Sequence, residues 1–117
     1  MNILKDKEII VENVKYCDSL FSRAKGLMFS KELKDTEGLI LVSDNESIVK
    51  STIHTFFCFY SMDVLWLNKD LKVVDKKENL KPFKLSIKPK KPSKYVLELK
   101  NGKSKDIKIG DRLTFIE

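Results

Sequence analysis

Residues 53–67 constrain the fold of this chain most strongly, because they form its most apolar window. They read IHTFFCFYSMDVLWL and hold five aromatic residues, the only histidine, the only tryptophan and one of the two cysteines. β-Branched and aromatic residues dominate, which is typical of strands. A membrane-spanning helix needs about 20 consecutive apolar residues, and this window is too short and too interrupted. It therefore predicts the centre of a hydrophobic core.

Two ionisable residues lie within this apolar window. On a strand, His54 would share a face with Phe56 and Cys58, and Asp63 would share one with Leu65, because side chains alternate between faces. A buried polar group is costly unless it is hydrogen-bonded. We therefore expect each of the two to have a partner, or to face a pocket at the end of a strand.

The length and composition are typical of one globular domain. A chain of 117 residues is expected to form a single domain over residues 1–117, with a core that needs no disulfides. The start, MNILKD, lacks the apolar region of a signal peptide, and no segment predicts a membrane span. We therefore expect a cytoplasmic protein with no membrane partner. Cys17 and Cys58 are expected to be buried free thiols, and one disulfide between them is the alternative.

The net charge of +6 is unevenly distributed along the chain. Residues 1–58 carry 8 basic and 9 acidic side chains, whereas residues 59–117 carry 15 basic and 8 acidic ones. Most of the excess lies in residues 81–108, which contain ten lysines. Such an asymmetry indicates an acidic partner, or else a solubilising surface.

Short strands separated by turns are predicted along most of the sequence. From their apolar and β-branched content, strands are expected at residues 8–15, 37–42, 48–59, 62–67, 71–77, 95–99 and 112–116. Residues 19–29 predict a short helix capped by Asp18 or Ser19, in which Gly26 marks an early end or a close backbone approach. The polar residues 68–70 predict a hairpin turn, and the proline-containing residues 79–94 an exposed connection. This pattern predicts a mainly β fold, either a small distorted β-barrel or a jelly-roll-like sandwich, with one or two short helices.

Several segments occur together in an order that resembles a known family. They are residues 23–29 (RAKGLMF), 37–41 (EGLIL), 54–57 (HTFF), 62–67 (MDVLWL), 72–74 (KVV), 95–99 (YVLEL), Gly102 and residues 109–111 (IGD). Over residues 22–113 this set resembles the family known as domain of unknown function 192, in its archaeal form. The resemblance implies a compact, mostly β domain like a distorted barrel or jelly roll, with short helices.

The same resemblance implies little about chemistry, because the family has no settled activity. Some of its members are secreted and carry signal peptides, whereas no signal peptide is expected for this chain. Many members have a Trp-Met-Lys segment where this chain has residues 54–59, so the resemblance does not transfer to this chain a polar group that other branches have at that site. The chemistry therefore has to be argued from the residues themselves.

The candidate ligand-binding residues are ionisable side chains beside apolar or glycine-containing motifs: Arg23, His54, Asp63, Glu98 and Asp111. If they converge, Arg23 could hold an anionic group through two hydrogen bonds. His54 with Asp63 or Glu98 could act as a general acid–base pair. The alternative is a set of structural ion pairs, with Asp111 serving a turn. The sequence contains no nucleophile motif, so no catalytic residue is predicted.

Metal and thiol chemistry are not expected at His54 and Cys58. Four positions apart on a strand, these side chains would be separated by about 13 Å. They could neither chelate one ion nor form a thiol–imidazole pair at that distance. One histidine and two cysteines also do not match a zinc pattern, so no metal or cofactor is predicted.

Nucleic acid is the alternative partner. The lysines that could neutralise phosphates are Lys84, Lys88, Lys90, Lys91 and Lys94. Aromatic residues are sparse around them, whereas binding of single strands by stacking usually needs several, and no nucleic-acid-binding motif occurs.

The leading prediction is a monomeric, non-catalytic binding module with a polar pocket for a small anionic ligand. The alternatives are nucleic-acid binding through residues 81–108, and an enzyme that uses a histidine–carboxylate pair.

Overall fold

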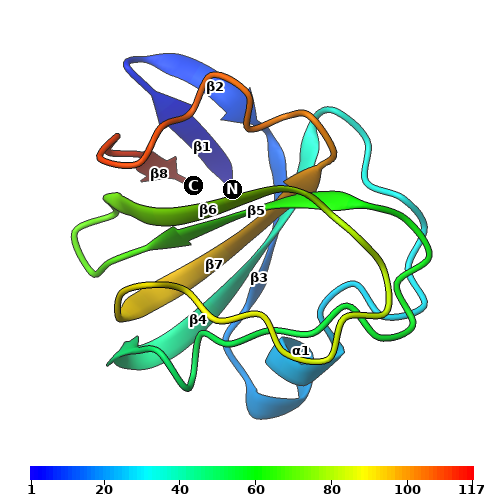
Figure 1. Ribbon diagram of the computed structural model, residues 1–117. Coiled ribbons are helices and arrows are strands. Elements are labelled where there is room, and N and C mark those ends of the chain that lie inside the picture. The colour runs from blue at the N-terminus through cyan, green and yellow to red at the C-terminus, as the bar shows by residue number, and fades with distance from the viewer.

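The computed structural model describes residues 1–117, apart from the side chains of Leu20 and Phe21. The chain forms two β-sheets and the short helix α1 (Leu20–Lys25), as Figure 1 shows. The strands are β1 (Asn2–Lys5), β2 (Glu8–Val11), β3 (Asn13–Cys17), β4 (Glu37–Ser47), β5 (Met62–Leu67), β6 (Val73–Leu80), β7 (Ser93–Lys100) and β8 (Thr114–Ile116). The predicted mainly β fold with a short helix is confirmed.

The five-stranded sheet has the order β3-β4-β7-β5-β6, and the three-stranded sheet has the order β2-β1-β8. β3 and β4 are parallel, because the chain crosses between them through α1. The other pairs are antiparallel. β7 is the central strand of the larger sheet, where it pairs with β4 on one side and β5 on the other.

Both faces of the five-stranded sheet are covered. The three-stranded sheet covers one face, and α1 with the long connections covers the other (Figure 1). All six residues of β5 are buried, because alternate side chains enter the two cores. Leu65 and Leu67 face the three-stranded sheet, whereas Val64 and Trp66 face α1 and the connections. Each large side chain removed from water in this way stabilises the fold by roughly 1.5–3 kcal/mol.

The strand predicted at residues 48–59 is wrong. This segment is an irregular connection, and its ladder contact is a single bridge between Ile53 and Ile87. Hydroxyl side chains at its start bond to nearby backbone: Ser47 Oγ accepts from the Lys50 N–H, and Thr52 Oγ1 donates to the Ile48 carbonyl. Such local bonds compete with strand pairing, so an apolar composition alone did not determine the backbone conformation here.

Three other segments can be compared with the predictions. The strand expected at residues 8–15 is divided into β2 and β3, which belong to different sheets. β1 was not predicted, and it joins β2 through a turn in which Asp6 and Lys7 both have positive φ. The predicted hairpin after β5 is confirmed, with β6 starting at Val73.

The two thiols are buried and unpaired, as predicted. Both contribute to the core beneath α1 and the connections. Burial raises the pKa of Cys17, and it raises the pKa of Cys58 to about 11. Both thiols are therefore protonated and unreactive at neutral pH. Among the described residues, no helix has the length and apolar character that a bilayer crossing requires.

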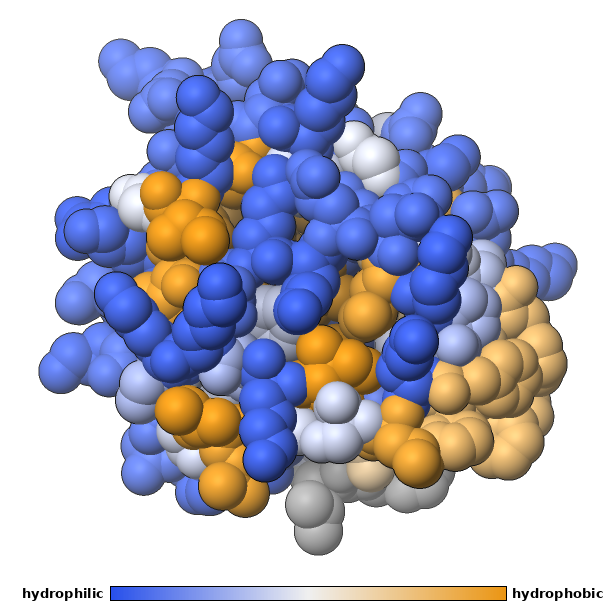
Figure 2. Space-filling model, viewed as in Figure 1, coloured by the Kyte–Doolittle hydropathy of each residue, from blue (hydrophilic) through white to orange (hydrophobic). Residues whose placement is uncertain are grey.

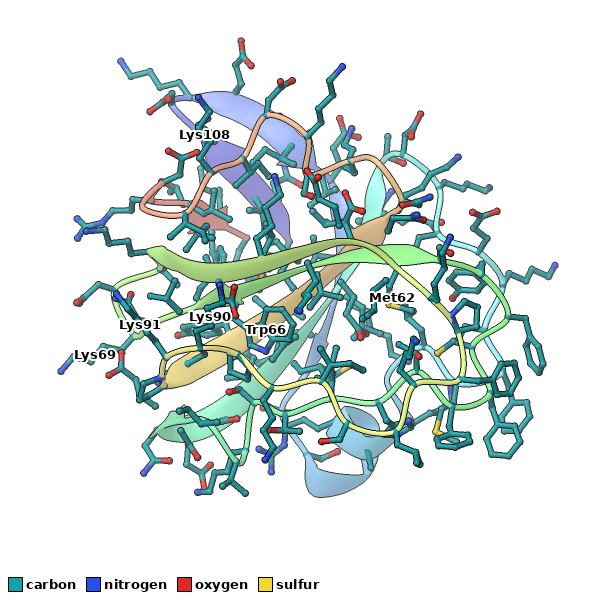
Figure 3. The ribbon with its side chains drawn as sticks, in the orientation of Figure 1. Met62, Trp66, Lys69, Lys90, Lys91 and Lys108 are labelled. Atoms are coloured by element: carbon teal, nitrogen blue, oxygen red, sulfur yellow. The ribbon has the colours of Figure 1, made fainter. Side chains whose placement is uncertain are left out.

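Trp66 ties the connection after β4 to the sheet, because its indole Nε1–H donates a 2.8 Å hydrogen bond to the Ser51 carbonyl. The side chain is buried between the sheet and the connections in front of it (Figure 3). Trp66→Phe leaves that carbonyl without this donor, so we expect the free energy of unfolding to fall by about 1–3 kcal/mol. Urea denaturation, monitored by circular dichroism, measures this change in the free energy of unfolding.

The matched control is Tyr16→Phe, which also removes one polar group from an aromatic side chain, but at an exposed position. We expect Tyr16→Phe to alter the free energy of unfolding by no more than about 0.5 kcal/mol. Equal stability of the Trp66→Phe variant and the wild type would contradict a structural role for this hydrogen bond.

Candidate functional site

A cavity of about 230 Å³ lies between α1 and the connection that follows β4; we call it the α1 pocket. Its walls come from three parts of the chain: the end of α1 and the residues after it, the connection at residues 50–58, and the sheet beneath. The lining residues are Arg23, Ala24, Lys25, Gly26, Leu27, Leu41, Lys50, Thr52, Ile53, His54, Cys58 and Glu98. The pocket therefore combines apolar walls with three basic side chains, one histidine and one carboxyl group.

The helix presents basic residues to the pocket because both of its ends are fixed locally. At the start, Ser19 Oγ accepts from the Ser22 N–H at 3.0 Å, and the Ser22 hydroxyl accepts from the Ser19 N–H at 3.1 Å. After six helical residues the helix ends at Gly26, whose φ of 46° lies in the left-handed region. The last turn therefore carries Arg23 and Lys25 at the pocket.

Gly26 also lies beside the Glu98 side chain of the sheet. A Cβ atom at this position would lie 3.5 Å from Glu98 Oε1, so a larger side chain would extend into the space above that carboxyl group. Of the two readings of Gly26 from the sequence, the early helix end is confirmed, whereas a Cβ atom would make only an ordinary contact here, so the close backbone approach is not.

Glu98 contributes the carboxyl group of the pocket from the centre of the sheet. It lies on β7, directly opposite Leu39 on β4 and Val64 on β5, and only 3% of it is exposed. Its Oε1 has no hydrogen-bond partner among the described groups. Burial raises the pKa of Glu98 to about 8, so the carboxyl group is mostly protonated at neutral pH.

Arg23 is the second polar group of the pocket with unused hydrogen-bonding capacity. Its Nη1 donates a long bond of 3.4 Å to Ser43 Oγ, whereas its Nε is buried without a partner among the described groups. Within the described part of the chain, Arg23 and Glu98 form no ion pair. Two of the three buried side-chain polar atoms found without partners among the described residues thus belong to residues that line this pocket.

His54 is held by the backbone and not by a carboxylate. Its Nδ1 accepts from the Phe56 N–H at 3.2 Å, which places the ring proton on Nε2, and Nε2 lies 3.3 Å from the Ala24 carbonyl. His54 therefore joins the connection to the helix across the pocket. Within the described residues it has no carboxylate at ion-pair distance, so the predicted acid–base pair is not formed.

Asp63 lies on the other face of the sheet, among the residues packed under the three-stranded sheet. It is fully buried and accepts from the Asn79 N–H at 3.0 Å, the Ser104 N–H at 2.9 Å and the Ser104 hydroxyl at 2.6 Å. Burial alone would raise the pKa of Asp63, but the hydrogen bonds from Ser104 and Asn79 hold it below its usual value. Asp63 therefore fastens the loop at residues 101–106 to the sheet and does not line the α1 pocket.

Asp111 is also remote from the α1 pocket. Its Oδ2 accepts from the Lys108 N–H at 2.8 Å and forms an ion pair of 2.9 Å with Lys5. The backbone hydrogen bond from Lys108 and the side-chain bond from Lys5 lower the pKa of Asp111. Three of the five candidate ligand residues thus converge, and Asp63 and Asp111 have structural contacts elsewhere.

Three of the five candidate nucleic-acid lysines line two separate surface hollows. Lys84 and Lys88 line one with Lys77, whereas Lys91 lines another with Lys72. Figure 3 places Lys90 and Lys91 on the same side of the view as Lys69, with Lys108 beside the three-stranded sheet. Lys94 lies over the Tyr95 ring at 5.6 Å. Binding of nucleic acid by these residues stays a prediction.

Sequence reasoning missed Lys25 and Lys50, which complete the basic lining of the pocket. Lys25 carried a signal, because it falls in the last helical turn two residues after Arg23. Lys50 carried none, since its segment was predicted as a strand. Among the described residues, no group of three histidine, cysteine or acidic side chains is placed to hold a metal ion.

Asp63→Asn tests the structural role of Asp63. The amide group cannot accept from all three donors, so we expect the free energy of unfolding to fall by about 1–3 kcal/mol at neutral pH. The pKa of Asp63 is lower in the folded state than in the unfolded state. Its ionised carboxylate therefore stabilises the fold above the unfolded-state pKa of 3.8, and this stabilisation is lost as pH falls through the folded-state pKa. The variant should therefore lose less stability on acidification.

Urea denaturation of both proteins at neutral and at acidic pH measures this difference. Asp111→Asn is the control, because it changes a carboxylate at the partly exposed end of an ion pair, where we expect a smaller effect. A fully stable Asp63→Asn variant would contradict this role.

Comparison with known proteins agrees with this architecture. A solved structure of a protein of unknown function from Novosphingobium aromaticivorans superimposes with a TM-score of 0.86. The match covers 97% of this chain and 82% of that one at 24% sequence identity, so it supports the fold alone.

Curated relatives are more similar in sequence. A UPF0127 protein of Pyrococcus furiosus is 36% identical over 115 residues, covering 97% of this chain and 94% of the relative. A UPF0127 protein of Pyrococcus horikoshii is 35% identical over 102 residues, covering 86% and 84%. The model of the uncharacterised family DUF192 ("Uncharacterized ACR") matches residues 2–115, a wider region than the sequence motifs indicated. The chain therefore belongs to the domain of unknown function 192 family.

Proposed function

We propose that the α1 pocket binds a small organic anion with a short apolar part, and that the protein is a binding module. The observation that carries this proposal is a pair of buried polar atoms, Arg23 Nε and Glu98 Oε1, which lack partners and belong to two residues that line the same cavity. Buried polar groups in proteins are nearly always hydrogen-bonded, so such a pair favours a ligand that supplies the missing bonds.

The charge of the lining favours an anion. Arg23, Lys25 and Lys50 are basic, and Glu98 is the acidic residue of the lining. Since the raised pKa of Glu98 keeps it mostly protonated at neutral pH, it adds a hydrogen-bond donor and no negative charge. Arg23 can meet a carboxylate or phosphate through two parallel N–H groups.

The size and walls of the cavity favour a compact ligand. A volume of 230 Å³ is below the about 300–1,000 Å³ of sites for drug-sized molecules. Leu27, Leu41 and Ile53 supply an apolar surface for a short aliphatic group. A short-chain carboxylate or a small phosphate ester satisfies both requirements.

A binding role is favoured over catalysis because His54 is engaged by backbone groups at both nitrogens. It would have to leave these bonds to act as a general base. We further propose that the protein acts in the cytoplasm, a location supported by its two unpaired buried thiols.

Amide NMR titration with butyrate and with methyl phosphate tests the site. We expect saturable shifts at Gly26, His54 and Glu98, and none with butyramide, which has the same shape as butyrate without the charge. Arg23→Gln should weaken binding by about tenfold or more, because a charge-assisted contact is lost. Lys72→Gln, which removes a positive charge outside this pocket, is the matched control. Shifts that do not saturate, or that Arg23→Gln leaves unchanged, would refute the proposal.

Anion binding should weaken as pH rises through about 8, the pKa of Glu98. Deprotonation replaces a donor with a negative charge beside the anion, so the dissociation constant increases. In the Glu98→Gln variant the amide still donates a hydrogen bond and cannot ionise. We therefore expect its affinity to vary less between about pH 7 and pH 9, as measured by the same titration. An identical pH profile in both proteins would argue against a contact between Glu98 and the anion.

The buried carboxyl group should also make stability depend on pH. The pKa of Glu98 is raised from 4.5 to about 8, so the folded state holds a proton that the unfolded state loses. The free energy of unfolding should therefore decrease as pH rises from about 5 to about 8. Glu98→Gln removes this dependence. Urea denaturation between about pH 5 and about pH 8 measures the free energy of unfolding of both proteins. If the wild type were as stable at the upper pH as at the lower pH, the burial of a protonated Glu98 would be contradicted.

A further inference from the structure

Four phenylalanines from three separate connections form one exposed aromatic cluster, which we call the phenylalanine surface: Phe29, Phe57, Phe59 and Phe83. The ring centroids of Phe29 and Phe57 are 4.9 Å apart, and those of Phe59 and Phe83 are 5.5 Å apart. Despite these contacts, Phe29 is 68% exposed and Phe59 is 62% exposed. Figure 2 shows pale apolar atoms protruding at the right edge of the molecule.

The backbone holds these rings outward in an unusual conformation. Phe29, Phe57 and Phe83 have φ values of 57°, 58° and 60°, in the left-handed region that bulky residues rarely adopt. Backbone hydrogen bonds fix this arrangement: the Phe29 N–H donates to the Phe57 carbonyl at 2.9 Å, and the Phe83 N–H to the Thr55 carbonyl at 2.8 Å. Strained residues of this kind cluster at functional sites. Three of them displaying aromatic rings to solvent indicate a contact surface.

The residues beside the phenylalanine surface are mainly basic. Lys31 follows Phe29 by two positions, and Lys81 and Lys84 flank Phe83; all three are exposed. Glu32 is the acidic residue near these segments. In the chain, the phenylalanines are therefore flanked mainly by exposed lysines, which we call the lysine rim, and this favours a partner that is both apolar and negatively charged.

The shape and charge favour a lipid bilayer as that partner. A bound peptide uses a groove, whereas these rings protrude and are not part of the α1 pocket. A symmetric contact with a second copy would place the lysine rim against itself. An anionic bilayer accepts aromatic side chains at its interface and attracts lysines at its surface.

We propose that the phenylalanine surface docks on anionic bilayers, with the rings at the level of the headgroups and the flanking lysines on anionic lipids. This proposal departs from the sequence-based expectation of no membrane partner, which rested on the lack of a membrane-spanning segment, because surface docking needs no such segment. It is independent of ligand binding in the α1 pocket.

Vesicle flotation of the full chain tests the proposal, with phosphatidylcholine–phosphatidylglycerol vesicles compared with phosphatidylcholine alone. We expect binding to the mixed vesicles that weakens as salt rises. The double variant Phe59→Ser with Phe83→Ser should partition at least about tenfold more weakly, because inserted apolar area is lost. Ile109→Ser is the matched control, since Ile109 is 59% exposed and lies in another loop.

A second variant tests insertion without removing an aromatic ring. Phe59→Trp should show tryptophan emission that moves to shorter wavelength on the mixed vesicles, over a constant background from buried Trp66. Three results would overturn the proposal: no binding at low salt, equal partitioning of the double variant and the control, or concentration-dependent self-association that the double variant abolishes. Unaltered circular dichroism of each variant confirms that folding is intact.

Discussion

The five-stranded sheet must be covered on both faces, and the rest of the structure follows from this constraint. Its inner strands carry apolar side chains in both directions, so a single layer cannot bury them. The three-stranded sheet covers one face with regular structure. The chain covers the other face with one short helix and three irregular connections. The two faces therefore differ in regularity, and the α1 pocket and the phenylalanine surface both lie on the irregular side.

Two buried carboxyl groups, one on each face of the sheet, differ in their hydrogen bonds and in their pKa. Asp63 and Glu98 lie on neighbouring strands, with their side chains on opposite faces of the sheet. Asp63 receives three hydrogen bonds and has a lowered pKa, whereas Glu98 Oε1 receives none and has a raised pKa. Both carboxyl groups are buried, so the presence or absence of hydrogen-bond donors decides whether the pKa is lowered or raised. The satisfied carboxylate is structural, and the unsatisfied carboxyl group is the one that lines a cavity.

Irregular connections explain why a cavity and an exposed aromatic cluster occur on the same side. A connection that bonds to itself through Ser47 and Thr52 cannot pack as closely on the sheet as a strand or a long helix. Two hydrogen bonds hold the connection at separate points. Trp66 on the sheet bonds to Ser51 of the connection, and His54 of the connection bonds to Ala24 of the helix. The space between these attachments contains the α1 pocket. Beyond His54, the chain turns outward through Phe57 and presents its rings to solvent.

The apolar pattern of the sequence predicted β5, the hairpin that follows it and the central strand β7. Capping and glycine preferences predicted a cap at Asp18 or Ser19 and, as one of two readings, an early helix end at Gly26; the structure has Ser19 and the early end, which depend on residues close together in the chain. The apolar pattern failed at residues 48–59, where phenylalanines that suggested a buried strand are held in a connection and partly exposed. Composition cannot distinguish an aromatic side chain in a core from one displayed on a surface.

The sequence by itself determined the fold class and the family, because alternation, turn residues and motif order are local properties of the chain. Only the tertiary structure decided which ionisable residues meet. Arg23, His54 and Glu98 converge because the C-terminal end of α1 lies beside Glu98 of β7 and the later connection lines the same pocket. Asp63 and Asp111 are equally plausible in the sequence, but one faces the opposite core and the other belongs to a distant turn. Side chains far apart in the chain come together through strand order and layer packing, which no single segment encodes.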